Sequence, residues 1–497
     1  MTMHLAQSLA SLQLDPTASV PMFRQLYEAI KQTILAGTIG PGMQLPPTRE
    51  LASQLRVSRQ TVLNAYAQLM AEGYLSGTVG RGTFVSASLP IAHKSRLHGA
   101  AAKLQLLRPL SARGQCFVGP QAVLNYHSGM PKAFRIGMPG LDVFPFDVWA
   151  RLEARRWRHT PHELGYGDAA GFHPLREGLA AYLGAARGVH CAPEQIIITS
   201  GSQQALFLIA SLLLSPGDAA WVEEPGYRGI NASLRAAQAH VCHIPVDDEG
   251  LSVAYGAAMH PDAKLTYVTP SHQLPLGVTM SLQRRLELLA WAAERRMWVV
   301  EDDYDSEYRY TGPPIASLQS LDKAGCVIYV GTLSKVLFPG LRLGYIVAPP
   351  ALAEAFAQGK AILDRHTAIG PQMVLADFIA EGHFSRHIKR TREVYAERRA
   401  TLLDAIAAHM PDEFHIGPAD AGLHLPVRFR CKRNDQMLAR TALQHGIELR
   451  ALSQFYNADE EADGLGSRVS GLLLGFASIP EAEIKRGVAT LRELLEK

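Results

Sequence analysis

The chain has 497 residues, of which 49 are Lys or Arg and 46 are Asp or Glu, so its formal net charge is only +3. Hydrophobic residues make up 47% of the sequence and charged residues 19%, a composition that excludes a disordered chain and is typical of folded domains. The length predicts more than one domain. The small net charge does not by itself indicate a nucleic-acid partner.

The cysteines and the apolar segments exclude further classes of protein. The five cysteines are scattered, without the paired spacing of a zinc site or a disulfide framework. The longest mostly apolar run, residues 205–214, is too short to span a bilayer, and the N-terminus lacks the pattern of a signal peptide. We therefore expect a cytoplasmic protein with reduced thiols, no metal site and no membrane contact.

The first predicted element is a helix over residues 22–34, where apolar side chains recur at helical spacing. A second helix is expected after two prolines, with the hydroxyl of Thr48 as its N-cap. A third helix follows a short turn, and Ser58 is expected to cap it. The buried stripe of this third helix is predicted to comprise Val62, Ala65, Tyr66 and Leu69.

Two short β-rich runs follow the third helix, at residues 74–75 and 83–85, and predict a hairpin. Two helices joined by a tight turn and followed by a hairpin form a winged helix-turn-helix. The residues outside the buried stripe then become candidates for contact with DNA. The alternative for each of them is an ordinary solvated helix face or hairpin turn.

The start of a recognition helix contacts base edges, and Arg suits guanine because its guanidinium donates two hydrogen bonds. The residues that the third helix presents there are Arg59, Gln60, Thr61 and Asn64. Thr48 and Arg49, at the start of the second helix, suit phosphate. Arg81, at the tip of the hairpin beside Gly82, is placed to enter a minor groove.

The run LPPTRELASQLRVSRQTVLNAYAQLMAEGYL, followed by VGRGTFV, closely resembles the GntR family of winged helix-turn-helix regulators. The resemblance implies that the residues at the DNA include Thr48, Arg49, Ser58, Arg59, Thr61, Asn64, Arg81 and Gly82. We assign this DNA-binding domain to residues 1–86. Residues 87–125 have weak periodicity and are expected to form a linker.

From residue 126 to the end, short β-rich runs alternate with helical stretches, which predicts an α/β sheet with parallel strands. Ligands of such sheets bind at the carboxyl ends of the strands. The β-rich runs cover residues 196–198, 220–222, 265–268, 298–300 and 327–330. The tail after about Arg386 is expected to form a smaller α/β subdomain.

Two of these runs lead into residues with unusual chemistry. Lys335 follows residues 327–330 among small and apolar neighbours, where desolvation favours the neutral, nucleophilic amine. Nearby, the hydroxyls of Thr332 and Ser334 and the guanidinium of Arg342 suit a phosphate. The run EDDYDSE, residues 301–307, follows another strand. Consecutive acids cannot all be paired in a core, so several are expected to be solvated or to meet a cation.

Two further turns offer phosphate donors and an aromatic ring. Ser200, Gly201, Ser202 and Gln203 lie where a strand leads into a helix, and the N–H groups and dipole of a helix start attract anions. Tyr227 follows residues 220–222 and presents a ring that can stack on a ligand, although a single Tyr is more often a packing residue.

Together these groups meet the demands of pyridoxal-phosphate (PLP) chemistry. Lys335 would form the Schiff base, Asp302 would hold the pyridine nitrogen protonated, and Tyr304 would donate to the ring's 3′-oxygen. Tyr227 would stack on the ring. The phosphate would be held by donors from Ser200, Gly201, Ser202, Gln203, Thr332, Ser334 and Arg342.

In this order the segments resemble fold-type I PLP enzymes of the class I aminotransferase kind, and the whole chain is similar to the MocR subfamily of GntR regulators. The phrases TPSHQLPLG, EDDYDSEYRY and LLLGFA resemble that subfamily in particular. The resemblance implies an α/β, PLP-dependent transferase-like large domain with PLP as its cofactor. It also implies a homodimer, commonly head-to-tail, in which each DNA-binding unit reaches over its partner's large domain.

Two positions depart from an active aminotransferase. Such enzymes carry an Asn that donates to the ring's 3′-oxygen and an Arg that holds the substrate carboxylate, and the matching positions here are Leu274 and Leu473. Losing that Arg should damage amino-acid turnover. His272 or Gln273 is a candidate to compensate for the Asn. Arg468, Arg450 and Arg228 are candidates for a ligand, but the sequence places none of them.

The leading hypothesis is a PLP-dependent transcription regulator that senses an amino acid, an amine or PLP itself and has no steady enzymatic turnover, although a half-reaction can persist. The first alternative is an active class I aminotransferase with an appended DNA-binding domain. The second is a DNA-binding protein whose large domain merely dimerises. The sequence does not identify the effector, the operator or the sign of regulation.

Overall fold

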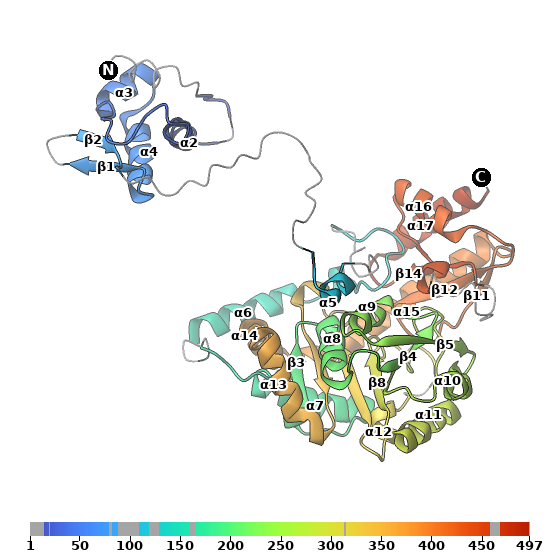
Figure 1. Cartoon of the computed structure of the whole chain (residues 1–497). Coiled ribbons are helices and arrows are strands. Elements are labelled where there is room, and N and C mark those ends of the chain that lie inside the picture. The colour runs from blue at the N-terminus through green and yellow to red at the C-terminus, as the bar shows by residue number, and fades with distance from the viewer. Residues whose placement is uncertain are drawn as a thin grey trace. The chain divides into compact units, whose positions relative to one another are not determined.

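The computed structural model of the chain describes residues 14–18, 20–78, 82–87, 109–118, 129–159, 163, 165–312, 315–457 and 468–496. The chain divides into two compact units, Met1–Pro109 and Leu110–Lys497, each of which is described by itself (Figure 1). Arg81 and most of the expected linker lie outside the described residues.

The described residues of the N-terminal unit form three helices and a hairpin: α2 (Met22–Leu35), α3 (Thr48–Leu55), α4 (Arg59–Ala71), β1 (Leu75–Thr78) and β2 (Gly82–Val85). The strands are antiparallel, with Leu75 opposite Val85. The buried residues of α4 are the predicted stripe, Val62, Ala65, Tyr66 and Leu69, and they pack against α2 and α3 in one core. The expected winged helix-turn-helix is confirmed.

Of the two predicted N-caps, the structure contains one and lacks the other. The Ser58 hydroxyl accepts a hydrogen bond from the backbone N–H of Thr61 at 3.0 Å, as predicted for the N-cap of α4. The prediction for Thr48 is wrong, because Pro47 is the N-cap of α3 and no side chain caps this helix. Thr48 already belongs to the helix, so its hydroxyl does not occupy the capping position.

The second unit is built on an eight-stranded sheet with the order β3-β10-β9-β8-β7-β4-β5-β6. All five predicted strands are present. The strands are β3 (Ile196–Thr199), β4 (Ala219–Glu224), β5 (His240–Asp247), β6 (Gly250–Leu251), β7 (Leu265–Val268), β8 (Trp298–Asp303), β9 (Val327–Thr332) and β10 (Gly344–Val347). Strand β10 is antiparallel to both neighbours, β3 and β9. The sheet is therefore mixed, and β10 brings the ends of β3 and β9 together.

Helices cover both faces of this sheet (Figure 1). Residues of α8, α9 and α13 pack on one face, and residues of α7, α11 and α14 pack on the other. The helices of this layered domain are α6 (Phe146–His159), α7 (His173–Arg187), α8 (Ser202–Leu213), α9 (Arg228–Ala236), α10 (Val253–Met259), α11 (Leu282–Arg295), α12 (Leu318–Leu321), α13 (Ala353–Asp364) and α14 (Ile369–Ala380), preceded by the short α5 (Ala112–Cys116). The expected aminotransferase-like α/β class is confirmed.

The C-terminal part forms the expected smaller subdomain. Its antiparallel sheet has the order β11-β12-β14-β13. The elements are α15 (His383–His409), β11 (Phe414–Ile416), β12 (His424–Phe429), α16 (Asp435–Gln444), β13 (Arg450–Ala451), β14 (Gly471–Gly475) and α17 (Glu481–Leu495). Helices α15 and α17 share a hydrophobic core with one face of this sheet.

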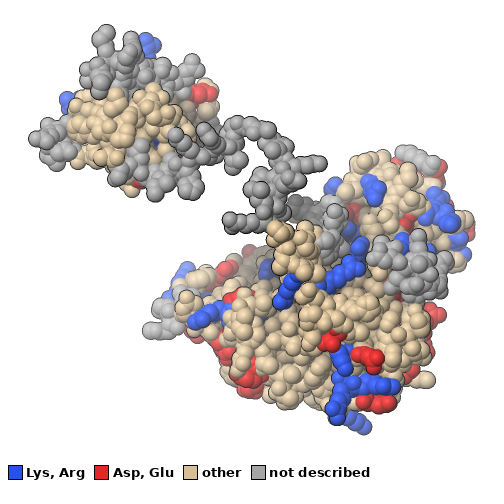
Figure 2. All heavy atoms as spheres, in the orientation of Figure 1, with Lys and Arg blue, Asp and Glu red and all other residues tan. Residues whose placement is uncertain are grey.

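The charges of the second unit are distributed in two ways. On the face drawn in Figure 2, basic and acidic side chains are interspersed, in agreement with the small net charge. Of the acids in residues 301–307, Glu301, Asp302, Asp303 and Asp305 are buried and therefore not solvated. Glu301 accepts from the N–H groups of Leu318 and Gln319, and Asp303 pairs with the cation Arg187, which is one of the two alternatives that the sequence left open. No described helix is long and apolar enough to cross a membrane.

Candidate cofactor site and DNA-binding surface

The start of α4 presents a polar surface. Arg59, Gln60 and Asn64 are exposed, and Thr61 is half-buried. The Gln60 amide donates a hydrogen bond to the Asn64 amide oxygen at 2.8 Å, so these two side chains lie side by side one helical turn apart. At the start of α3, Arg49 is exposed and Thr48 is half-buried. The predicted base-contacting residues thus share one accessible helix end.

Gly82, the first residue of β2, is the candidate DNA contact that lies among the described residues of the hairpin. Its φ of +108° lies where residues with a side chain are rare. A Cβ added there would also lie 2.6 Å from the side-chain nitrogen of Gln44. Glycine is therefore required at this bend for steric reasons, whether or not the hairpin contacts DNA.

Lys335 lies in the turn after β9, and its Nζ donates a hydrogen bond to the carbonyl oxygen of Gly137 at 2.8 Å. Gly137 has a φ of +71°, and a Cβ there would lie 2.7 Å from Nζ. Burial lowers the pKa of Lys335, while the nearby carboxylates of Asp305 and Asp302 oppose this shift. Burial thus shifts Lys335 towards the neutral amine that nucleophilic attack requires, relative to a lysine in water.

Asp302, at the end of β8, is buried and makes one hydrogen bond, accepting from the Tyr267 hydroxyl at 2.7 Å. Its other oxygen, Oδ1, is buried without a hydrogen-bond partner among the described residues. Burial raises the pKa of Asp302 to about 7. A buried carboxylate needs a positively charged partner, and the protonated pyridine nitrogen of PLP fits this requirement. Sequence reasoning missed Tyr267, which only the pairing of β7 with β8 brings to Asp302.

The expected phosphate donors come from two turns that β10 brings together. An Arg342 guanidinium nitrogen donates to the Ser200 carbonyl at 2.8 Å, and a Cβ on Gly201 would lie 3.3 Å from that guanidinium. Gly201 is the N-cap of α8, with a φ of +99°. A Cβ on Gly344 would lie 2.9 Å from the Gly201 backbone. These glycines let the guanidinium of Arg342 lie close to the start of α8, so that both face one surface on which a phosphate could bind.

The remaining expected donors form smaller contacts around this surface. Ser202 is the first residue of α8 and is half-buried. The Gln203 amide oxygen accepts from the Tyr227 hydroxyl at 3.1 Å, and its nitrogen donates to Ser233 and to the Gly229 carbonyl. The Thr332 hydroxyl accepts from the backbone N–H of Ser334 at 3.3 Å. Tyr227 is thereby tied to the start of α8; its stacking on a ring stays a prediction.

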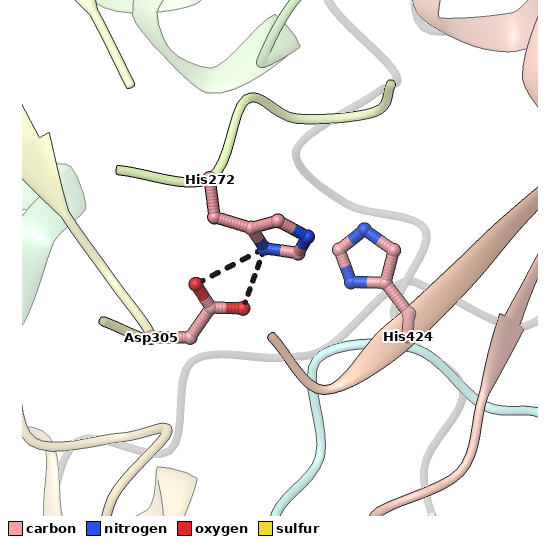
Figure 3. Close-up of side chains that lie close together, drawn as sticks. All are labelled: His272, Asp305 and His424. Atoms are coloured by element: carbon pink, nitrogen blue, oxygen red, sulfur yellow. Dashed lines mark hydrogen bonds and ion pairs between the residues drawn. The ribbon is translucent and has the colours of Figure 1, made fainter. Parts of the chain in front are cut away.

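A buried cluster that the sequence did not predict joins Tyr304 to the Lys335 side of the site. The Tyr304 hydroxyl donates to the His272 carbonyl at 2.9 Å and lies 3.1 Å from His272 Nδ1. His272 Nδ1 also lies 3.1 Å from an Asp305 oxygen, and the rings of His272 and His424 lie next to each other, tilted by 41°, with their centroids 5.0 Å apart (Figure 3). Burial, His272 and Lys335 hold the pKa of His424 well below its usual value.

This cluster contains residue types that bind metals. One ligand atom from each of His272, Asp305 and His424 lies within 4.8 Å of the others. The sequence spacing gave no signal for it, because the residues come from two loops of the large sheet and from β12 of the small one. The cluster also ties Tyr304, the expected partner of the cofactor's 3′-oxygen, to a hydrogen-bonded chain.

The structure describes the surroundings of Leu473 and of Gln273, one of the two residues expected to compensate for the missing Asn. Leu473 is fully buried and packs against Leu276 and Val278. The Gln273 amide nitrogen donates to the Glu223 carboxylate and to the carbonyls of Pro225 and Leu274, so it is committed within the protein. Gln273 therefore does not replace the missing Asn, whereas His272 Nε2 is buried without a hydrogen-bond partner among the described residues and stays a candidate.

Comparison with known proteins agrees with this two-part construction. Residues 23–85 match the family described as bacterial regulatory proteins, gntR family, and residues 137–489 match aminotransferase class I and II. A probable rhizopine catabolism regulatory protein, MocR, of Rhizobium meliloti is 40% identical, over 97% of this chain and 95% of that protein. The chain belongs to the MocR subfamily of GntR regulators. Its N-terminal unit is accordingly a DNA-binding domain.

One further relative matches nearly the whole chain, and one solved structure matches about three quarters of it. The pyridoxine biosynthesis regulator PdxR of Corynebacterium glutamicum is 30% identical, over 97% of this chain and 98% of that protein. A kynurenine aminotransferase of Pyrococcus horikoshii, solved with PMP, has a TM-score of 0.66 and 29% identity, over 76% of this chain and 96% of that chain. Class I and II aminotransferases are PLP-dependent, so PLP is the cofactor of the large unit.

Proposed function

We propose that the large unit of this MocR regulator uses PLP as part of a sensor and not for steady catalysis. One set of observations supports this proposal: Arg342 lies against Ser200 and Asp302 is near Lys335, whereas Leu274 and Leu473 stand at the positions where an aminotransferase has the two polar groups that handle a substrate. A ligand of the sensor changes transcription only if it favours one arrangement of the regulator over another.

Different residues would hold the different parts of the cofactor. Lys335 would hold the PLP aldehyde carbon covalently, and Asp302 would pair with the pyridine nitrogen through its unpartnered oxygen. Tyr304 would donate to the 3′-oxygen. When bound, PLP supplies an electron sink for an amine attached to it. The ring would lie against Tyr227, and the phosphate would contact Ser200, Gly201, Ser202, Gln203, Thr332, Ser334 and Arg342.

The N-terminal unit would read double-stranded promoter DNA through its exposed helix end. Arg59, Gln60, Thr61 and Asn64 would contact base edges, with Ser58 fixing the start of the helix. Thr48 and Arg49 would contact phosphate, and Arg81 with Gly82 would follow the minor groove. The family resemblance supports a head-to-tail homodimer of chains, each with a DNA-binding domain over residues 1–86, a linker over residues 87–125 and a sensor domain over residues 126–497.

The effector would be an amine, an amino acid or PLP itself. The main alternative, an active aminotransferase with a DNA-binding appendage, keeps one argument in its favour, since the fold and the lysine turn are those of an enzyme. We expect at most a half-reaction, because the apolar positions leave a substrate carboxylate and the 3′-oxygen without their usual partners.

Spectroscopy of the purified full chain tests the cofactor part of the proposal. The wild type should absorb at about 420 nm, as PLP imines of lysine do, and borohydride should fix a pyridoxyl group on Lys335. Lys335→Ala should lose both signals. If this variant keeps the band and the reducible adduct, Lys335 is not the attachment point.

Genome-wide mapping of binding sites tests the regulatory part. The tagged wild type should occupy discrete promoters, and Arg59→Ala should lose them. Lys335→Ala should still bind DNA but should no longer change occupancy when the effector pathway is induced. Target genes for PLP synthesis or for the use of an amine would identify the effector class. Diffuse occupancy that Arg59→Ala does not alter would contradict the assignment of a specific regulator.

A further inference from the structure

Three side chains of metal-binding types meet where the small sheet approaches the large one. His272 lies in the loop after β7, Asp305 lies in the turn after β8, and His424 is the first residue of β12. All three are buried, and each is exposed by 3% or less. One ligand atom from each lies within 4.8 Å of the others. The cluster is therefore closed off from bulk water and spans both parts of the large unit.

Hydrogen bonds fasten together the segments that carry these residues. The Gly422 N–H donates to the Tyr308 carbonyl at 2.8 Å, and the Tyr310 hydroxyl donates to the Gly422 carbonyl at 2.8 Å. Gly422 has a φ of +85°, and a Cβ there would lie 2.0 Å from Cε1 of His272. Glycine thus lets the chain just before His424 pack directly against the His272 ring. The backbone holds the two histidines close together, whatever lies between them.

Asp305 fixes the orientation of the His272 ring. Its two carboxylate oxygens lie 3.1 and 3.2 Å from His272 Nδ1. When the ring is neutral and donates to Asp305, the proton is on Nδ1 and a lone pair is left on Nε2. Histidines that bind metal ions are commonly held in this way, by a carboxylate that accepts from the ring nitrogen away from the ion. His272 therefore has the arrangement of a metal ligand.

The Nε2 atoms of both histidines are unpaired. Each is buried without a hydrogen-bond partner among the described residues. The ring centroids are 5.0 Å apart, and Figure 3 shows the Nε2 end of His272 directed towards His424. Buried polar atoms are normally paired, because leaving them unpaired costs free energy. Two unpaired nitrogens on neighbouring rings, beside a buried carboxylate, form a place that suits a cation which accepts nitrogen lone pairs.

We propose that His272 and His424 bind a divalent transition-metal ion of the zinc type through their Nε2 atoms, with Asp305 as the carboxylate that orients His272. Imidazole suits Zn²⁺, Cu²⁺ and Ni²⁺, whereas Mg²⁺ and Ca²⁺ prefer oxygen ligands. The ion would fasten β12 of the small sheet to the loops of the large one, and water would complete its coordination. This site goes beyond the sensor function and does not require PLP. It takes the nitrogen that His272 would otherwise offer to the cofactor's 3′-oxygen.

Zinc binding to the full chain tests this inference. The protein is freed of metals with a chelator, both with and without PLP, and is then titrated with Zn²⁺ against a chromophoric competitor. The wild type should bind about one Zn²⁺ per chain in both forms, and excess Mg²⁺ should not displace it. His424→Phe should lose this ion. Asp305→Asn, which removes the orienting charge, should weaken binding roughly 10- to 100-fold.

His243 provides a matched control. It is also buried beside a carboxylate, with its Nδ1 2.9 Å from a Glu224 oxygen. Its Nε2, however, lies 3.2 Å from the side-chain nitrogen of Asn457, so both ring nitrogens already have contacts. His243→Gln should therefore bind Zn²⁺ as tightly as the wild type does.

Unfolding provides a second readout. Because the unfolded chain does not hold His424 beside His272, Zn²⁺ should raise the free energy of unfolding of the wild type and of His243→Gln, but not of His424→Phe. His424→Gln, which keeps a polar side chain without an imidazole, should behave like His424→Phe. Far-UV circular dichroism checks that each variant is folded before zinc is added.

Three results would overturn the inference. One is a wild type that binds no Zn²⁺ more tightly than His424→Phe does. Another is Zn²⁺ binding that His424→Phe and His424→Gln both keep, because the ion would then lie elsewhere. The third is equal competition by Mg²⁺, which would indicate a site made of oxygen ligands. A wild type without a PLP band contradicts the sensor proposal instead and leaves the zinc result unaffected.

Discussion

The two units of this regulator place their functional residues in opposite environments. In the N-terminal unit most of the candidate DNA contacts that the structure describes are exposed side chains near the starts of α3 and α4, such as Arg49, Arg59 and Asn64. In the large unit the candidate cofactor contacts come from turns far apart in the chain, and Asp302 and Asp305 are buried. A surface that reads DNA needs only correct local spacing, whereas a cofactor site needs distant turns brought together by a sheet.

The pKa values of buried groups in the large unit reflect the same difference in environment. In the large unit, burial raises the pKa of Asp302 and Glu223 to about 7 and lowers that of Lys335. Such shifts mark places where the fold keeps charged groups away from water until a ligand compensates them. The following predictions test this contrast, beginning with the largest expected effect.

The largest effect is the expected absence of steady turnover. Aminotransferase-like geometry around Lys335 would support an ordinary enzyme rate of about 10 per second if the substrate were handled as in an enzyme. Because Leu274 and Leu473 are apolar, we expect multiple-turnover transamination below about 1 per second for common amino acid and keto acid pairs. Stopped assays with excess of both substrates measure this rate, and a faster one would favour the aminotransferase alternative.

The next prediction concerns Asp302 in protein freed of PLP. Its pKa is raised from 3.8 to about 7 by burial, so between these values only the unfolded state releases the proton. The contribution of Asp302 to the free energy of unfolding should therefore fall as pH rises through this window and stay low above it.

Asp302→Asn removes this titration, so the stability of the variant relative to the wild type should rise with pH from about 4 to about 7. Denaturant unfolding of both apo proteins across this range measures the difference, and the other buried carboxylates cancel because both proteins contain them. PLP should stabilise the wild type and have a smaller effect on the variant. A difference that is independent of pH would contradict a buried, unpaired Asp302.

A third prediction separates two arginines of the DNA-binding unit. Arg59→Ala should cost about 1–3 kcal/mol at the specific site and flatten the preference among operator variants. Arg49→Ala should weaken binding to specific and scrambled duplexes alike and lower the salt slope by about one counterion. Titrations of both duplexes at several salt concentrations distinguish them. Equal loss at both duplexes for Arg59→Ala would show that α4 does not read bases.

The smallest predicted effect is local stability at the N-cap of α4. The Ser58 hydroxyl accepts from the Thr61 N–H at 3.0 Å, and losing such a cap costs about 1 kcal/mol. Ser58→Ala should therefore reduce hydrogen-exchange protection of the α4 amides roughly five-fold. Ser58→Asn should keep the cap, and neither change should alter the PLP absorbance. Unchanged protection in Ser58→Ala would mean that the cap contributes nothing to the reading helix.

Much of the architecture follows from the sequence by itself. The stripe of Val62, Ala65, Tyr66 and Leu69 was predictable because the buried face of a helix is set by a period of about 3.6 residues. The five predicted strands and the lysine turn were predictable for a similar reason, since β-rich runs and the turns that follow them are contiguous in the chain. The expected cap at Thr48 failed because helix ends depend on a single backbone residue.

Only the tertiary structure decided which distant residues meet. The antiparallel insertion of β10 brings Arg342 to Ser200, and the pairing of β7 with β8 brings Tyr267 to Asp302. The packing of the two sheets brings His424 beside His272, and strand register places Arg450 beside Leu473. Local spacing determines which face of an element is buried, but register between strands depends on the packing of the whole sheet. For this reason the sequence named Arg450 as a candidate and could not place it.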